Sequence, residues 1–278
     1  MPSNYFEIQI PVKGELAEIL IAELSDLSFD SFVEEESVLK GYVPEDQYNE
    51  QELIEILRVY NVENKYQVIK VETKNWNEEW EKNYDPVEVI VGDEKRVKVR
   101  ASFHDSDSSF KYDILINPKM SFGTGHHATT SNMLKLMTMM PLKDKSTVDL
   151  GTGTGVLAIM AHKLGAKSIR ACDIDTWCVE NGNENFQLNG IDTVQVELGT
   201  AGLYENDNFD VVLANINRNV LLSEMGIYAN ICQEHLVLSG FYEHDLEIVN
   251  ESATAQGFTF LKKEVRNDWV AALYKRTN

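Results

Sequence analysis

Asp149-Leu150-Gly151-Thr152-Gly153-Thr154-Gly155 is the stretch of this sequence that decides its fold. An apolar strand pattern precedes the glycines and an apolar helix pattern follows them, which is the setting of a nucleotide-binding turn. Gly151 allows the tight turn, Gly153 allows a ligand to approach the backbone, and Gly155 lets the helix begin close to the sheet. The stretch therefore predicts a loop that holds a nucleotide-like cofactor.

The spacing of these glycines separates the possible cofactors. The dinucleotide-binding fingerprint would place its third glycine at Val156 instead of Gly155, which disfavours NAD and FAD. A phosphate loop of the Walker type is excluded because no Gly-Lys-Ser/Thr follows. The spacing favours S-adenosylmethionine, and the alternative is a turn that binds nothing.

Polar side chains at the ends of two further expected strands add to this site. Asp173 follows the loop at about the separation where a carboxylate meets ribose hydroxyls. Asp175 lies two residues on and is interpreted as a helix N-cap. Asn215 ends the fourth expected strand at the ligand edge of the sheet and offers a carbonyl acceptor and an amide donor. We expect Asp173 and Asn215 to contact the ligand; the alternative for Asn215 is helix capping.

From residue 147 the sequence alternates short apolar strands with helices, which predicts a parallel sheet covered on both faces. The last two expected strands are joined by only a few residues, so they form an antiparallel hairpin. The predicted fold class is thus α/β, a doubly wound, Rossmann-like, seven-stranded domain of the methyltransferase form. Its expected strands are 147–150, 168–172, 193–198, 209–214, 236–241, 259–265 and 269–274, preceded by strands at 96–102 and 112–117, and its expected helices are 156–164, 176–189, 219–231 and 245–256.

A second glycine loop, Phe122-Gly123-Thr124-Gly125-His126-His127, precedes another expected helix. Its glycines allow movement, and Phe122 and Thr124 suit contact with a ligand, so we interpret it as a lid. Thr129 or Thr130 is expected to cap the helix. No metal site is predicted, because the adjacent histidines lack a carboxylate or a third histidine at ligand spacing.

The first seventy-odd residues show the order strand, helix, strand, strand, helix, strand, which is that of a small ferredoxin-like α+β domain. Residues 1–75 carry 6 basic and 16 acidic side chains, which gives a net charge of −10. Such a surface is either merely solvated or docks a positively charged macromolecule. The expected strands are 5–11, 29–35, 38–43 and 66–73, and the expected helices are 16–24 and 50–60.

Trp76, Trp80 and Tyr84 mark the segment between the two expected domains. They recur every fourth residue and therefore share one face of a helix. We expect this helix to pack a linker against one domain or the other. The expected boundaries are 1–74 for the first domain, 75–95 for the linker and 96–278 for the second domain.

The composition of the whole chain limits its partners. There are 25 Lys and Arg against 45 Asp and Glu residues, and this net charge of −20 is unfavourable for gripping phosphate backbones. No run approaches the roughly 20 apolar residues of a membrane span, and no signal peptide is evident. Three cysteines without a Cys-x-x-Cys pair indicate reduced thiols. We expect a cytoplasmic monomer that binds neither nucleic acid nor membrane.

Taken together, these segments resemble the PrmA family, the methyltransferases of the ribosomal stalk-base protein L11. The resemblance covers nearly the whole chain and implies a recognition domain joined by a mobile linker to a catalytic domain. It also implies cofactor contacts at Thr124, Gly151, Asp173 and Asn215. Asn217-Arg218-Asn219 departs from the family, where small apolar residues and a proline are common. The segments that carry the resemblance are Trp76 with Trp80, Phe122–Gly125 with Thr129-Thr130, Asp149–Gly155 with Leu157-Ala158-Ile159, Asp173-Ile174-Asp175, Asn189-Gly190 and Ala214-Asn215-Ile216.

The resemblance implies transfer of methyl groups from S-adenosylmethionine to lysine side chains, the N-terminal amine or both, in a basic ribosomal protein, L11. Asn215 is the hypothetical catalytic residue, because its carbonyl can orient an amine. Two alternatives stay open: a nucleic-acid amino-methyltransferase, and a non-catalytic module that only binds the cofactor. The former usually carries two prolines where this chain has Ile216 and Asn217. The predicted cofactor-binding residues are Phe122, Thr124, Gly151, Gly153, Asp173 and Asn215.

Overall fold

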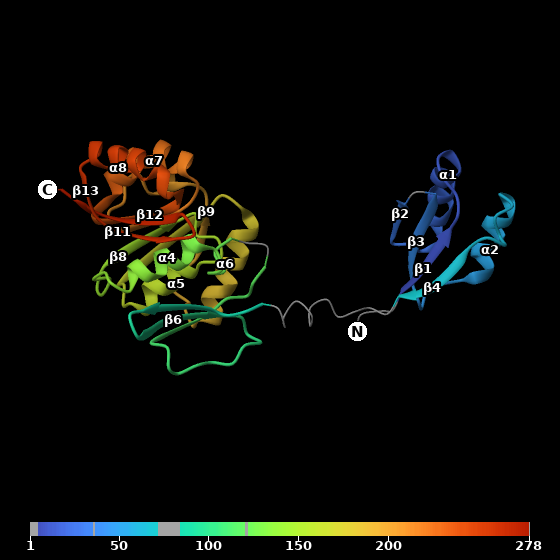
Figure 1. Cartoon of the computed structure of the whole chain (residues 1–278), viewed down its shortest axis with the longest axis horizontal. Coiled ribbons are helices and arrows are strands. Elements are labelled where there is room, and N and C mark those ends of the chain that lie inside the picture. Colours follow the sequence, from blue (N-terminus) through green and yellow to red (C-terminus); the bar gives the residue numbers. More distant parts are fainter. Residues whose placement is uncertain (1–4, 36, 72–83, 120–121, 278) are drawn as a thin grey trace. The chain divides into compact units, whose positions relative to one another are not determined.

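The computed structural model describes residues 5–35, 37–71, 84–119 and 122–277, and the chain divides into two compact units, Met1–Tyr84 and Asp85–Asn278 (Figure 1). The second unit begins before the expected boundary at residue 96. It does so because β5 (Val87–Val91) pairs with β6 (Glu94–Arg100), so part of the expected linker is sheet. The expected helix with Trp76 and Trp80 lies outside the described residues.

The first unit is a four-stranded antiparallel sheet with two α-helices, in the order of elements that the sequence predicts. The strands lie in the order β2-β3-β1-β4. Alternation along β1 buries Ile8 and Ile10, which pack with Leu20 and Leu53 from the helices. The elements are β1 (Tyr5–Ile10), α1 (Glu15–Leu24), the 3-10 turn η1 (Ser25–Leu27), β2 (Ser31–Glu35), β3 (Val38–Pro44), α2 (Glu50–Val59) and β4 (Gln67–Val71).

The second unit is built on a seven-stranded mixed sheet with the order β10-β9-β8-β11-β12-β14-β13. Its first five strands are parallel, and β14 runs antiparallel between β12 and β13. Asn267 and Asp268 make the tight turn of the expected hairpin, with φ of 50° and 63°. The strands are β8 (Ser146–Leu150), β9 (Ser168–Asp173), β10 (Val196–Leu198), β11 (Phe209–Asn215), β12 (Cys232–Tyr242), β13 (Phe258–Arg266) and β14 (Trp269–Arg276).

Helices cover both faces of this sheet (Figure 1). One face packs against α4, α5 and α6, and the other packs against α7 and α8. The central strands β8 and β11 are therefore mostly buried on both sides, as expected for parallel strands covered by helices. The helices are α4 (Ala128–Met137), α5 (Val156–Lys163), α6 (Thr176–Leu188), α7 (Arg218–Ile231) and α8 (Leu246–Ala255), with the 3-10 turns η2 (Ala201–Tyr204) and η3 (Glu243–Asp245).

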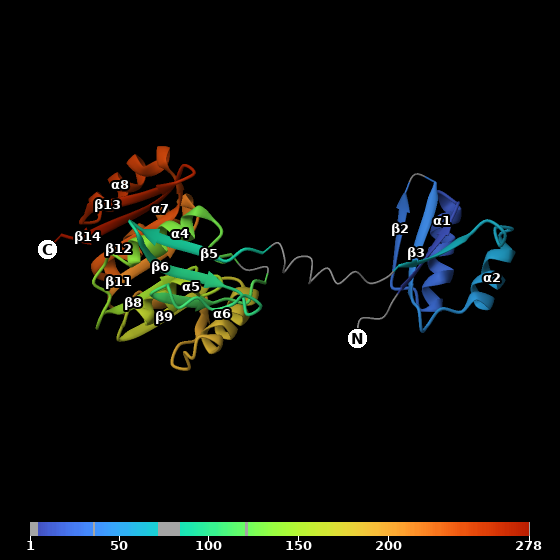
Figure 2. The same ribbon diagram turned by 60° about the horizontal axis from the view of Figure 1, so that its bottom comes forward.

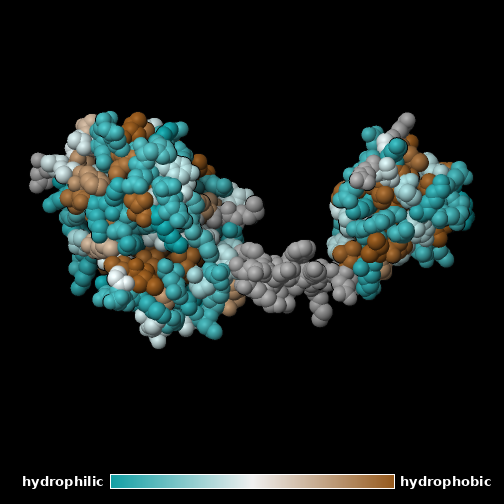
Figure 3. Space-filling view, viewed as in Figure 1, coloured by the Kyte–Doolittle hydropathy of each residue, from teal (hydrophilic) through white to brown (hydrophobic). Residues whose placement is uncertain are grey.

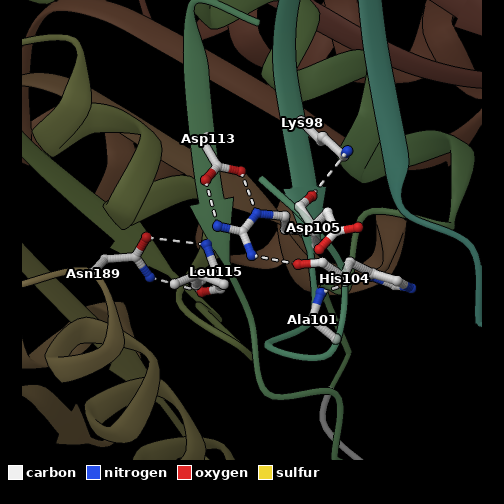
Figure 4. A network of polar contacts seen from close by, with 8 residues as sticks. Lys98, Ala101, His104, Asp105, Asp113, Leu115 and Asn189 are labelled. Carbon is white, nitrogen blue, oxygen red and sulfur yellow. Dashed lines mark hydrogen bonds and ion pairs between the residues drawn. The ribbon is translucent and has the colours of Figure 1, made fainter. Parts of the chain in front are cut away.

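A small sheet of β5, β6 and β7 (Tyr112–Leu115) lies against α4 and α5 (Figure 2). The Arg100 guanidinium donates two hydrogen bonds, of 2.8 and 2.7 Å, to the Asp113 carboxylate. The Asn189 side chain, after α6, pairs with both the N–H and the C=O of Leu115 (Figure 4). The Arg100–Asp113 pair joins β6 to β7 within the small sheet, and the Asn189 contacts fix this sheet to the body of the second unit.

The faces of both units visible in Figure 3 are mostly hydrophilic, with scattered hydrophobic patches. This fits the net charge of −20. Among the described residues, no helix combines the length and apolarity needed to cross a membrane.

Candidate functional site

A cavity of about 760 Å³ opens in the second unit at the carboxyl ends of the parallel strands. Loops after β8, β9, β10 and β11 converge there, together with Gly240 of β12, as expected for ligand sites in doubly wound sheets. The volume lies in the usual range for cofactor sites, roughly 300–1,000 Å³. The residues used below that line it are Phe122, His127, Gly151, Gly153, Cys172, Asp173, Ile174, Cys178, Asn215, Ile216, Asn217 and Trp269.

The glycine loop forms one wall of the cavity. Two of its residues have a left-handed backbone conformation, Gly151 with φ of 66° and Gly153 with φ of 55°. A Cβ on Gly153 would lie 2.2 Å from the carbonyl oxygen of Phe122. A Cβ on Gly151 would lie 2.3 Å from Cγ2 of Ile216. The position that a Cβ on Gly153 would occupy is therefore filled by the second glycine loop, while Gly153 itself lines the cavity. The glycines let three loops close together around the cavity.

Hydrogen bonds hold the second glycine loop on the first. The N–H of Thr154 donates to the Phe122 carbonyl at 2.9 Å, and its hydroxyl donates to the Gly123 carbonyl at 2.7 Å. Phe122 itself is 52% exposed and lines the cavity. The expected lid thus rests on the glycine loop in this structure.

Asp173 lies at the cavity wall, at the end of β9. Its carboxylate accepts hydrogen bonds from the N–H of Gly153 at 2.8 Å and of Asp175 at 3.1 Å. Each carboxylate oxygen keeps a second lone pair for a ligand hydroxyl. Asp175 caps α6 by accepting from the N–H of Trp177, which confirms its interpretation as an N-cap.

A second carboxylate, Asp149, lies fully buried beneath the loop. One of its oxygens accepts from the Thr152 hydroxyl at 2.6 Å and from the Ala158 N–H at 3.2 Å. Burial, helped by the nearby charge of Asp173, raises the pKa of Asp149 to about 7. Asp149 therefore supports the loop from inside.

Asn215 presents an unpaired acceptor inside the protein. Its amide donates to the Thr130 hydroxyl at 3.3 Å, while its buried Oδ1 has no hydrogen-bond partner among the described residues. A buried acceptor without a donor is costly, and functional sites are where such atoms occur. The capping alternative is wrong for this residue, because the N-cap of α7 is Asn217.

Another part of the cavity wall is aromatic. The His127 ring lies 5.3 Å from that of Phe122 and 4.6 Å from that of Trp269. Burial lowers the pKa of His127, so the neutral ring is favoured. His127, not Thr129 or Thr130, caps α4: its Nδ1 accepts from the Thr129 N–H. The expected cap was wrong because the histidine at the preceding position has the extended backbone that a cap requires.

The structure brings most of the predicted site residues together. Phe122, Gly151, Gly153, Asp173 and Asn215 all line the cavity. Thr124 does not line it, and its hydroxyl lies 3.1 Å from Nδ1 of His126 instead.

The residues of the wall that the sequence did not identify as site residues include His127, Ile216 and Trp269. Trp269 begins β14, and no local motif marks that position as part of a site. In the described parts of the chain no cluster of three or more His, Cys, Asp or Glu side chains is arranged to hold a metal ion.

A mixed sheet with helices on both faces and a cavity at the carboxyl ends of its parallel strands defines an α/β methyltransferase-like fold. A family model described as ribosomal protein L11 methyltransferase (PrmA) matches residues 13–277, so the chain belongs to the PrmA family.

Individual relatives agree with this assignment. The ribosomal protein L11 methyltransferase of Bacteroides fragilis is 40% identical over 281 residues, covering 98% of this chain and 99% of that protein. That of Porphyromonas gingivalis is 39% identical over 261 residues, covering 91% and 89%. A crystal structure of ribosomal protein L11 methylase from Lactobacillus delbrueckii subsp. bulgaricus matches with a TM-score of 0.62 and 26% identity, over 69% of this chain and 99% of that chain.

Proposed function

We propose that this protein transfers methyl groups from S-adenosylmethionine to amino groups of ribosomal protein L11, on lysine side chains, the N-terminal amine or both. Membership of the PrmA family supports the reaction and the acceptor. The observation in the structure that carries the proposal is the buried, unpaired Oδ1 of Asn215 beside the cavity.

The residues of the cavity suit S-adenosylmethionine. When bound, it supplies a methyl group already activated on a sulfonium. Asp173 accepts hydrogen bonds from the ribose hydroxyls, and Ile174 and Cys178 offer apolar contact beside it. Gly151 and Gly153 keep the glycine loop close to the ligand. Thr124 stays a predicted contact that requires movement of its loop, because it lies off the cavity wall.

The acceptor amine must be neutral to attack, yet a free lysine has a pKa of about 10.4 and an α-amino group of about 7.7–8.0. Phe122 and Trp269 exclude water from the aromatic part of the cavity wall. Partial desolvation of this kind lowers the pKa of an amine. Asn215 Oδ1 would accept an N–H of the amine and so orient its lone pair for attack on the methyl group. His127, kept neutral by burial, adds no positive charge there.

The first unit is proposed to be a ferredoxin-like recognition domain. Its βαββαβ order and its sheet order support the fold. The net charge of −10 over residues 1–75 suits a basic protein. The division into a recognition domain and a catalytic domain belongs to the same proposal, as do a cytoplasmic location, a monomeric state and the absence of nucleic-acid binding.

The test is a transfer assay with a mixed acceptor pool. Purified enzyme is incubated with methyl-labelled S-adenosylmethionine and with ribosomes from a strain that lacks this enzyme, and the label is located by mass spectrometry. We expect label on amines of L11. Label confined to ribosomal RNA would contradict the proposed acceptor, and cofactor binding without transfer would favour a non-catalytic module.

A further inference from the structure

The cavity wall around Asn215 comes from two neighbouring strands and the segments that follow them. The strands β11 and β12 pair in parallel, with Asn215 opposite Ser239, and Asn215 and Gly240 both line the cavity. After β11 come Ile216 and Asn217, both at the cavity, and then α7; after β12 comes η3.

Arg218 occupies an electrostatically unfavourable position in one of these segments. It is the first residue of α7, where the helix dipole repels a cation, and the first turn contains no acidic residue. Its guanidinium reaches out of the helix to the carboxylate of Asp245 in η3. It also donates to Oδ1 of Asn219, at 3.2 and 3.3 Å. The ion pair with Asp245 explains why a cationic side chain occupies the first position of α7.

Asp245 depends on this partner. Its side chain is only 10% exposed, and of the described Lys and Arg side chains only Arg218 forms an ion pair with it. His244 lies farther away, at 3.7 Å. Burial alone would raise the pKa of Asp245, but the hydrogen bond and charge of Arg218 outweigh it and hold that pKa below its usual value. The ion pair therefore joins α7 to η3.

From η3, ring contacts lead back to the cavity. Tyr242, which precedes η3, lies 4.0 Å from the ring of Trp269, and it also stacks on His244. Trp269 lines the cavity and contacts His127. The Arg218–Asp245 pair thus links the segment after Asn215 to η3. The residue before η3, Tyr242, packs its ring on that of Trp269.

We propose that Arg218 is a positioning residue for methyl transfer: its ion pair with Asp245 holds the loop of Asn215 and the turn that supports Trp269 at the spacing that the acceptor amine requires. The proposal rests on the proposed function. It assigns a role to Asn217-Arg218-Asn219, the segment where this chain departs from the family pattern. Arg218 acts through Asn215 and Trp269, and the cofactor-binding wall of Gly153 and Asp173 lies outside this linkage.

The test compares Arg218→Met, Asp245→Asn, the double variant and Arg218→Lys with the wild-type enzyme. The matched control is Arg170→Met, because Arg170 also pairs with a carboxylate, Glu197, and is similarly exposed, at 45% against 42% for Arg218. Each enzyme is assayed for kcat and KM with L11, for the Kd of S-adenosylmethionine by calorimetry, and for its melting temperature.

We expect each single variant to lower kcat for L11 by about 10-fold through misplacement of the acceptor. Cofactor affinity should stay within about twofold, since neither Arg218 nor Asp245 lines the cavity. The double variant should be no slower than either single variant, and Arg218→Lys should recover most of the rate because lysine keeps the point charge. Arg170→Met should match the wild type.

Two results would overturn the proposal. One is a wild-type kcat in Arg218→Met. The other is a parallel loss of turnover, cofactor affinity and melting temperature that Arg218→Lys does not restore, which would make the pair merely structural. Failure of the proposed function would give a different result, because the wild-type enzyme itself would then leave L11 unmethylated.

Discussion

The two walls of the cavity differ in how they are built. The wall of the glycine loop comes from neighbouring stretches of sequence, and the hydrogen bonds of Asp173 hold it in place. The aromatic wall is assembled from the loop at Phe122, the cap of α4 and the start of β14. Asn215, at the end of β11, keeps an acceptor without a hydrogen-bond partner among the described residues. The first wall is preorganised for a constant ligand, and the second leaves a group available for an incoming acceptor.

The largest expected effect on cofactor binding comes from adding a side chain to the wall of the glycine loop. Gly153→Ala would place a Cβ 2.2 Å from the Phe122 carbonyl and force a left-handed backbone on alanine. We expect no measurable binding of S-adenosylmethionine by calorimetry and a lower melting temperature. The control is Gly190→Ala, which has a similar φ of 70° but nothing within 4 Å. It should cost about 1–2 kcal/mol of stability and keep cofactor binding. Equal binding by both variants would contradict the role of the close approach.

The next largest effect is expected on the turnover of L11 when Asn215 is replaced. Asn215→Ala removes the unpaired acceptor, and we expect kcat for L11 to fall by about 100-fold, as when one positioned polar group is lost from an active site. Cofactor affinity should fall less than kcat. The control is Asn208→Ala, on an exposed asparagine that accepts a hydrogen bond from Gln233. Full turnover of Asn215→Ala would remove its catalytic role.

A smaller effect is expected from the aromatic wall. Trp269→Leu loses the ring contacts with His127 and Tyr242, and we expect kcat/KM for L11 to fall by about 10-fold. Trp269→Phe should retain most of the rate, and both variants should bind the cofactor normally in calorimetry. If the cofactor Kd changed as much as kcat/KM, the two walls would not be separable.

The smallest effect is a pH dependence from Asp149 in the first wall. The pKa of this buried carboxyl is raised to about 7 from its ordinary 3.8, so the folded state favours the protonated form. Its contribution to stability is full below pH 3.8 and is lost as the pH rises through about 7. Between pH 5 and 8 the melting temperature of the wild type should fall relative to that of Asp149→Asn.

Asp210→Asn is the control for this titration. The hydrogen bonds of Ser146 outweigh burial and lower the pKa of Asp210, so this residue contributes no slope above pH 5. Parallel melting curves for the wild type and Asp149→Asn across this range would show that Asp149 stays charged in the folded protein.

The difference between the glycine-loop wall and the aromatic wall also explains which features could be predicted from the sequence. The loop at 149–155, the position of Asp173 at the cavity and the final hairpin were predictable because each is a local pattern with a direct physical reading. Trp269 was not, because a tertiary approach places it at the cavity. β5 was missed because it is a short edge strand whose pairing defines it. The position of Thr124 off the wall depends on how its loop packs, which composition does not encode.

The most direct test of the central claim is the intact mass of purified L11 after incubation with S-adenosylmethionine and either the wild-type enzyme or Asn215→Ala. We predict mass increases in whole methyl units with the wild type, mapped to amino groups, and a strongly reduced rate with Asn215→Ala while the cofactor still binds. An unchanged mass of L11 with active, cofactor-bound wild-type enzyme would contradict the account.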